Sequence, residues 1–84
     1  MKIQLKYFAS IREALGQGGE TLEVAATTVG ALRDELIARG GAYAQALARG
    51  KAVRVALNQT MVGDEAASLS EGAEVAFFPP VTGG

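Results

Sequence analysis

The stretch that most restricts the fold is the ending of the chain, Phe77-Phe78-Pro79-Pro80-Val81-Thr82-Gly83-Gly84. Neither proline has a backbone N–H, so neither can extend a sheet ladder, and each biases the residue before it toward an extended conformation. The strand that holds the two phenylalanines is therefore predicted to stop at Pro79. Beyond it we expect a thin projecting arm, with a flexible tail at residues 81–84, that reaches about 17 Å when extended.

Apolar residues at alternate positions predict four strands and a short edge strand. These segments cover residues 2–8, 20–24, 53–57, 61–62 and 73–78. In the first segment Phe8 lies on the otherwise polar face, and in the last segment Phe78 does the same. If these two strands are parallel neighbours, both rings share the exposed face of the sheet, and Met61 joins them. We interpret this cluster as a partner interface, because a contiguous exposed apolar patch is typical of docking surfaces.

One apolar stripe predicts the main helix. The stripe repeats at 3.6 residues per turn and consists of Val29, Leu32, Leu36 and Ile37. Thr28 is a suitable N-cap, Gly40 and Gly41 end the pattern, and residues 42–48 add one or two further turns. Helix and strands together predict an α+β domain over residues 1–80, in which a mixed sheet carries one main helix on one face.

A short helix is expected directly after Phe8. Ser10 and Glu13 match the spacing of a capping box, in which each side chain satisfies a backbone N–H at the helix start. Gly16 would end this helix in a left-handed conformation. Arg12 then lies on the exposed side of this helix. Two interpretations of its role stay open: a charge that is simply solvated, and a contact with a partner.

Composition excludes several classes of function. With 8 basic and 9 acidic residues scattered along the chain, there is no basic patch for nucleic acid. No apolar run approaches the roughly 20 residues of a membrane span, and no signal-peptide core opens the chain, so we expect a cytoplasmic protein. The chain has no Cys and no His, and its acids, such as Asp34 and Asp64, lack metal-ligand or paired-carboxylate spacing. The remaining candidate for acyl or sulfur chemistry is the terminal carboxylate of Gly84.

Five motifs along the chain carry a resemblance to a known family. They are Phe8-Ala9, Arg12-Glu13, Ala31-Leu32-Arg33, Leu57-Asn58-Gln59 and the ending Glu74-Val75-Ala76-Phe77-Phe78-Pro79-Pro80-Val81-Thr82-Gly83-Gly84. On these motifs the chain resembles the small, sulfur-carrying subunit of molybdopterin synthase (the MoaD family), which has the ubiquitin-like β-grasp fold. The resemblance covers the whole chain, and its proline-containing ending is the most specific part. Ala73 departs from the family, which often has an acidic residue in this turn.

The resemblance implies a chemical role for the arm. An ATP-dependent activating enzyme of the E1 type would adenylate the Gly84 carboxylate, and sulfur from a desulfurase- or rhodanese-type donor would displace AMP to leave a thiocarboxylate. The residues of the arm that would insert into the large synthase subunit are Pro80, Val81, Thr82 and Gly83. There the sulfur would pass to cyclic pyranopterin monophosphate, in a heterotetramer of two small and two large subunits.

The same resemblance implies a chain that is non-catalytic alone and serves as the sulfur-donating subunit of a transferase complex. It would bind no metal and no cofactor of its own, since ATP is used by the activating enzyme. The residues expected at its partner interface are Phe8, Arg12, Met61 and Phe78. Two alternatives stay open: a sulfur carrier of another pathway, such as the thiamine pathway, and a ubiquitin-like binding module or modifier.

Overall fold

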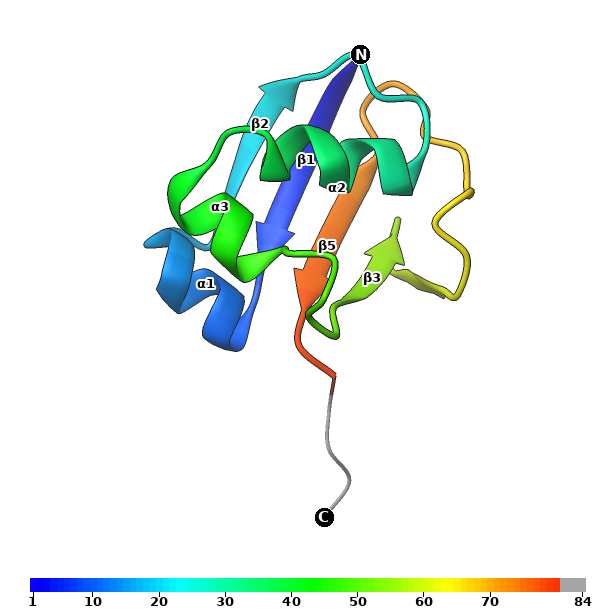
Figure 1. The fold of residues 1–84 in the computed structure, drawn as a ribbon. Helices are drawn as coiled ribbons and strands as arrows, with labels where there is room; N and C mark the ends of the chain where they lie inside the picture. Colours follow the sequence, from blue (N-terminus) through cyan, green and yellow to red (C-terminus); the bar gives the residue numbers. More distant parts are fainter. Residues whose placement is uncertain (81–84) are drawn as a thin grey trace.

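The computed structural model of the protein describes residues 1–80, and the predicted tail at residues 81–84 lies outside this range. Its elements appear in chain order in Figure 1. They are β1 (Lys2–Tyr7), α1 (Ala9–Leu15), β2 (Gly19–Glu23), α2 (Val29–Ile37), α3 (Gly41–Ala46), β3 (Arg54–Leu57), β4 (Thr60–Val62) and β5 (Glu74–Phe78). The predicted strands are therefore confirmed, with bounds shifted by at most one residue.

The strands form one mixed sheet in the order β2-β1-β5-β3-β4. The first and last strands, β1 and β5, are parallel neighbours at its centre, with Leu5 opposite Val75 and Tyr7 opposite Phe77. All other pairs are antiparallel. This register confirms the prediction that β1 and β5 pair. The first and the last strand in the sequence are therefore neighbours in the middle of the sheet.

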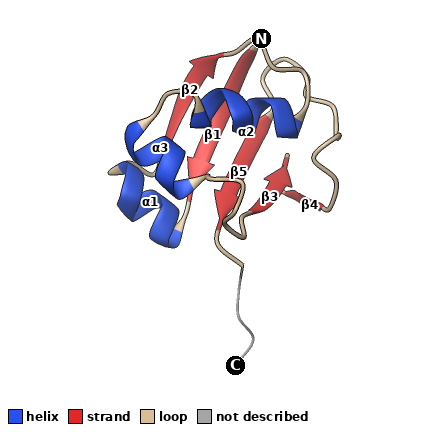
Figure 2. Ribbon diagram, in the orientation of Figure 1, coloured by secondary structure: helices blue, strands red, loops and turns tan. Residues whose placement is uncertain are grey.

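The helices cover one face of the sheet, as Figure 2 shows, and leave the opposite face bare. Thr28 caps α2 as predicted, because its hydroxyl accepts a hydrogen bond of 3.1 Å from the Ala31 N–H. The two predicted stop glycines instead separate two helices: α2 ends at Ile37, Gly40 is the N-cap of α3, and Gly41 is its first residue. Both glycines have a positive φ, which glycine adopts without strain.

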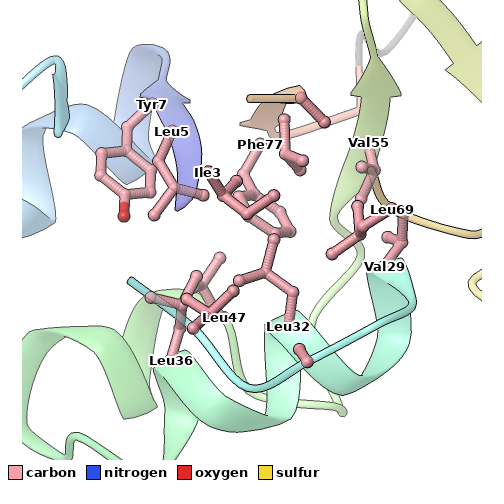
Figure 3. Packing of buried hydrophobic residues seen from close by; sticks show 14 of the residues in the cluster. Ile3, Leu5, Tyr7, Val29, Leu32, Leu36, Leu47, Val55, Leu69 and Phe77 are labelled. Atoms are coloured by element: carbon pink, nitrogen blue, oxygen red, sulfur yellow. The ribbon is translucent and has the colours of Figure 1, made fainter. Parts of the chain in front are cut away.

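The core lies between the covered face and α2 (Figure 3), and its residues are the inward members of each alternating pattern. The largest side chains with almost no exposed surface are Tyr7, Phe77, Ile3, Leu32, Leu36, Leu47, Val29 and Val75. Leu69 also enters the core, although it belongs to the loop between β4 and β5. The alternation and the helical stripe thus predicted the buried residues well, since both patterns place apolar side chains on one face.

The predicted capping box at Ser10 is wrong. A capping box at Ser10 would place the first helical residue at Ile11, but helix α1 begins two residues earlier, at Ala9, with Phe8 as an N-cap that makes no side-chain cap hydrogen bond. The reason lies in the sheet: the Phe8 N–H donates to the Phe77 carbonyl at 3.1 Å, while the Phe8 carbonyl already accepts from Ile11. Strand pairing therefore places the N-cap at Phe8, the backbone turns into the helix at Ala9 with a positive φ of 50°, and Ser10 lies inside α1. The predicted left-handed end at Gly16 is confirmed, with φ of 74°.

Candidate functional site

The last paired residue of β5 is Phe78, and the two prolines after it belong to no strand. Phe78 lies opposite Arg54 of β3, and the preceding Phe77 pairs with Tyr7. The predicted stop at Pro79 is thus confirmed. We call Phe78, Pro79 and Pro80 the arm root. It lies at one end of the sheet, where β1 and β5 both finish (Figure 1).

Phe8 and Phe78 meet on the bare face of the sheet, beside the arm root. Their ring centroids are 6.4 Å apart with an interplanar angle of 82°, an edge-to-face arrangement that aromatic quadrupoles favour. Phe8 keeps 46% of its surface exposed, and Phe78 is half-buried. The inference that these two residues share the outer face is therefore confirmed, and an exposed aromatic pair lies next to the point where the arm leaves.

Met61 lies on the same face but farther from the arm root. It is opposite Ala56, which is opposite Ala76, and Ala76 lies two residues before Phe78 on the same side of β5. Met61 is 48% exposed, and the alanines between it and the phenylalanine pair expose less surface. The small side chains of Ala76 and Ala56 therefore lie between the larger apolar side chains of the phenylalanine pair and of Met61. We call the set Phe8, Phe78, Ala76, Ala56 and Met61 the outer patch.

Arg12 lies on the exposed side of α1, as predicted. Its guanidinium packs against the loop after α1: a Cβ placed on Gly18 would be 3.3 Å from Arg12 Nε. The residue thus has a contact within its own chain, which its sequence position did not predict. Its assignment to a partner interface stays a prediction.

Sequence reasoning missed two cations beside the arm root. Arg54 is exposed and opposite Phe78, and Lys51 lines a cavity of about 110 Å³ whose wall includes Pro79. The other lining residues are Ser10, Ile11, Ala14, Ala46, Ala52 and Val53. Spacing alone could not have found this site, because α1, the loop after α3 and the arm root each contribute to it.

A buried arginine holds the Lys51 loop in place. Arg33 of α2 is only 5% exposed and donates to the carbonyls of Leu47 at 2.8 Å, Ala48 at 2.7 Å and Lys51 at 3.2 Å. Its remaining nitrogen donates to Glu65 at 2.9 Å, so the buried charge is both paired and hydrogen-bonded. The position of Lys51 beside the arm root therefore depends on α2, because Arg33 of this helix binds the loop after α3 directly.

Glu65 joins this network to the surface. It also binds Arg49, whose guanidinium pairs in turn with Asp34 at 2.8 Å and donates to the Gly30 carbonyl at 2.9 Å. The hydrogen bond from Arg49, followed by that from Arg33, holds the pKa of the Glu65 carboxyl below its usual value, while burial opposes the shift. These contacts connect α2 to the segments before β3 and after β4.

A second polar cluster supports the other end of the helical layer. The Glu20 carboxylate of β2 accepts hydrogen bonds from the Tyr7 hydroxyl at 2.8 Å, the Tyr43 hydroxyl at 2.5 Å and the Gln17 amide at 3.1 Å. Burial, followed by the hydrogen bond to Glu20, raises the pKa of Tyr7 well above its ordinary value. The same causes raise the pKa of Tyr43. These bonds attach α3 to the sheet.

Two classes of site find no support within residues 1–80. In this part of the chain, no three His, Cys, Asp or Glu side chains come together as potential ligands of a metal ion. Nor does any helix in the same range have the length and apolar character to cross a membrane. The features that distinguish the described surface are therefore the outer patch, the arm root and the two cations beside it.

Comparison with known proteins agrees on one family. A family model described as the ThiS family matches residues 5–84. The molybdopterin synthase sulfur carrier subunits of Haemophilus influenzae and Escherichia coli are each 43% identical to this chain over 82 residues. In both alignments the match covers 98% of this chain and 99% of the relative.

Solved structures share the fold over the full chain. The Haloferax volcanii HVO 2177 protein is 32% identical, with a TM-score of 0.79 and coverage of 100% of this chain and 87% of that one. The SAMP1 protein of the same organism is 26% identical, with a TM-score of 0.76 and full coverage of both chains. A complex of subunits 1 and 2 of the Helicobacter pylori molybdopterin-converting factor matches at 21% identity and a TM-score of 0.71, covering both chains fully. The fold is that of the ubiquitin-like β-grasp proteins, as expected.

Proposed function

This chain belongs to the ThiS family, and from that premise we propose that it is the sulfur-carrying small subunit of a molybdopterin synthase, acting in molybdenum cofactor biosynthesis. The observation that carries the proposal is the 43% identity to two sulfur carrier subunits across 98% of the chain. A sheet that stops at a proline pair beside an exposed apolar patch suits this role, because the sequence that follows ends in Gly83-Gly84, which have no side chains.

The reacting group in this proposal is the carboxylate of Gly84. A carboxylate is a poor electrophile, so an E1-like activating enzyme first converts it with ATP to an acyl-adenylate, which has a good leaving group. The outer sulfur of a persulfide on a desulfurase- or rhodanese-type donor then attacks the acyl carbon and releases AMP, and a thiol reductant cleaves the resulting acyl disulfide to leave the thiocarboxylate. The chain has no Cys and no His, so we assign the acids, bases and anion-binding groups of these steps to the partners.

Transfer takes place inside the large synthase subunit. The arm residues Pro80, Val81, Thr82 and Gly83 enter its site. The thiocarboxylate sulfur bonds to a carbon of cyclic pyranopterin monophosphate and displaces an oxygen substituent from it. Water then cleaves the acyl–sulfur bond, which leaves the sulfur on the pterin and regenerates the Gly84 carboxylate. The outer patch and Arg12 lie against the large subunit, in an assembly of two small and two large subunits. The exposed phenylalanine pair supports this orientation. The structural neighbour from Helicobacter pylori, a complex of subunits 1 and 2 of the molybdopterin-converting factor, supports the existence of a partner subunit.

The experiment that tests the function measures intact mass after reaction with the activating enzyme, ATP and a sulfur donor. We expect a gain equal to the replacement of one oxygen by sulfur, localised to Gly84 by fragmentation. A chain that lacks Gly84 is the matched control and should not gain the mass. An unchanged wild-type mass, with an activating enzyme that is active on another substrate, would contradict the proposal.

Gly84→Ala tests the steric part of the mechanism. The variant should fold like the wild type but accept sulfur poorly, since a methyl group crowds the carbon that the activating enzyme and the donor must reach. Normal thiocarboxylate formation on this variant would reject the steric argument while leaving the sulfur-carrier function intact.

A second candidate is a ubiquitin-like modifier. The observation that favours it is the likeness to SAMP1 of Haloferax volcanii, which a further structure names small archaeal modifier protein 1. In this case Gly84 would form an isopeptide bond with a lysine of a target protein. A Gly-Gly remnant on target lysines after proteolysis would support it, whereas a thiocarboxylate as the only product would favour the sulfur carrier, of this or another pathway.

A further inference from the structure

We propose that the cavity beside Pro79, together with Lys51 and Arg54, is a docking site for an acidic segment of the large synthase subunit that carries an aliphatic side chain. This inference rests on the proposed function, because it concerns the partner that receives the arm. The cavity and Lys51 lie on the side of the arm root that faces α1, whereas Arg54, opposite Phe78, lies on the face of the outer patch. The docking site therefore continues the outer patch around the end of the sheet.

Position is the first argument. The cavity of about 110 Å³ has Pro79 in its wall, so a protein that surrounds the arm must come close to it. Arg54 lies opposite Phe78, the residue that starts the arm root. The cavity and both cations therefore adjoin the same short stretch of β5 and the arm root that follows it.

The lining of the cavity is the second argument. Three of its residues are alanines, Ala14, Ala46 and Ala52, and the other apolar walls come from Ile11, Val53 and Pro79. None of these side chains is large enough to close the gap between α1 and the loop after α3. A concave apolar site of this size fits one aliphatic side chain of a partner, since burial of apolar surface on both sides is favourable.

Charge is the third argument. The ion pairs found within residues 1–80 leave four exposed cations without an ionic partner, namely Lys2, Arg12, Lys51 and Arg54. Of these, Lys51 and Arg54 adjoin the arm root. Two cations without an ionic partner in the described part of the chain favour a carboxylate-bearing surface opposite them.

The distribution of charge along the sheet strengthens this argument. At the far end of β1 and β5 the charges balance: Glu23 pairs with the Met1 ammonium at 2.9 Å, Glu74 pairs with Lys6 at 3.7 Å, and Glu71 lies beside Lys2 and accepts a hydrogen bond from its backbone N–H. On α1, Arg12 and Glu13 offset each other. The arm end is thus more positive than the far end, which orients the chain toward a negatively charged partner surface during approach.

The test compares charge-reversed variants at the two ends of the sheet. The partner is the large synthase subunit of the same organism, and binding is followed by surface plasmon resonance at low and high salt. Lys51→Glu combined with Arg54→Glu should slow association about tenfold at low salt and much less at high salt. Lys2→Glu, an exposed cation at the far end, is the matched control and should stay within about twofold of the wild type.

Ala52→Leu tests the cavity separately from the charges. The added side chain occupies the space reserved for the partner and should weaken affinity roughly fivefold at both salt concentrations. Ala31→Leu, on the exposed side of α2, is the control and should bind normally. Melting temperatures near that of the wild type establish that each variant is folded.

The outcomes separate this inference from the proposed function. Wild-type chain that does not bind the large subunit would overturn the proposed function and the docking site with it. Normal wild-type binding, with Lys51→Glu/Arg54→Glu behaving like Lys2→Glu, would overturn the docking site alone. An unaffected Ala52→Leu variant would overturn the assignment of an aliphatic side chain to the cavity.

Discussion

Two aromatic pairs join the ends of β1 and β5, one on each face of the sheet, and their ring centroids are both 6.4 Å apart. The inner pair, Tyr7 and Phe77, is stacked at 18° and almost wholly buried under the helices. The outer pair, Phe8 and Phe78, meets edge to face at 82° and leaves Phe8 nearly half exposed. The same residue chemistry at the same separation thus lies in two different environments, because successive residues of a strand point to opposite faces.

The difference teaches which contacts hold the domain and which are available for a partner. The inner pair exposes at most 1% of each side chain, so folding removes nearly all of its surface from water. The outer pair retains apolar surface that only another molecule can bury. We therefore expect changes at the inner pair to alter the free energy of unfolding, and changes at the outer pair to alter affinity for the large subunit.

The largest effect is expected at the centre of the core. Phe77→Ala should lower the free energy of unfolding by about 3–5 kcal/mol, because it leaves a cavity beneath α2. Denaturant unfolding measures this loss. Phe78→Ala is the matched change one residue along the strand and should cost less than about 1.5 kcal/mol, since its ring is only half-buried. If both variants lost the same free energy of unfolding, the inner and outer pairs would not differ in their contribution to stability.

The next effect is on binding. Phe8→Ala combined with Phe78→Ala should weaken affinity for the large synthase subunit about tenfold or more, because exposed aromatic residues are the side chains most often important at interfaces. Isothermal titration calorimetry measures the change. Phe8→Leu, which keeps apolar surface, should lose much less. Unchanged affinity in the double variant would show that the outer pair lies outside the interface.

The hydroxyl of Tyr7 makes the inner pair sensitive to alkaline pH. Burial and the bond to Glu20 raise the pKa of Tyr7 in the folded chain, so its contribution to stability is complete below about pH 10 and is lost as pH rises above that value. The loss should approach about 1.4 kcal/mol for each pH unit.

Tyr7→Phe tests this origin directly. It should cost about 1 kcal/mol near neutral pH, through the lost hydrogen bond, and should give a flatter stability profile above pH 10. The variant should still lose some stability with rising pH, because the pKa of Tyr43 is also raised, but the free energy of unfolding should fall less steeply than in the wild type. Parallel profiles for the wild type and Tyr7→Phe between pH 9 and 11, in urea unfolding, would rule out Tyr7 as the source.

The smallest effect is expected at the far edge of the outer patch. Met61 is exposed, and Ala56 and Ala76 lie between it and the aromatic pair. Met61→Ala should weaken binding of the large subunit only about two- to threefold and change stability by less than about 0.5 kcal/mol. A loss as large as that of the double phenylalanine variant would move the centre of the interface from the arm root to β4.

Much of the candidate site was predictable because it depends on local pattern. Alternation placed Tyr7 and Phe77 inside and Phe8 and Phe78 outside, and the missing N–H of Pro79 ended the last strand. The motifs also indicated the correct family. Each of these features depends on residues that are close together in the sequence, within one or two helical turns or a few positions of one strand. A short stretch of sequence is therefore enough to predict it.

The start of α1 shows where local pattern failed. Ser10 and Glu13 have the right spacing for a capping box, yet the backbone enters the helix at Ala9, because Phe8 is hydrogen-bonded to Phe77. A partner almost seventy residues away in sequence overrides a preference worth about 1 kcal/mol. No window around Ser10 contains that partner.

The sequence by itself determined the two faces of each strand, the apolar stripe and Thr28 cap of α2, and the end of the sheet at Pro79. Only the tertiary structure decided that Phe8 meets Phe78, that Arg33 is buried against three carbonyls, and that Lys51 and Arg54 adjoin the arm root. The physical reason is the range of the interactions. Periodicity and capping act between neighbours along the chain, whereas strand register and buried hydrogen bonds join segments that only folding brings together.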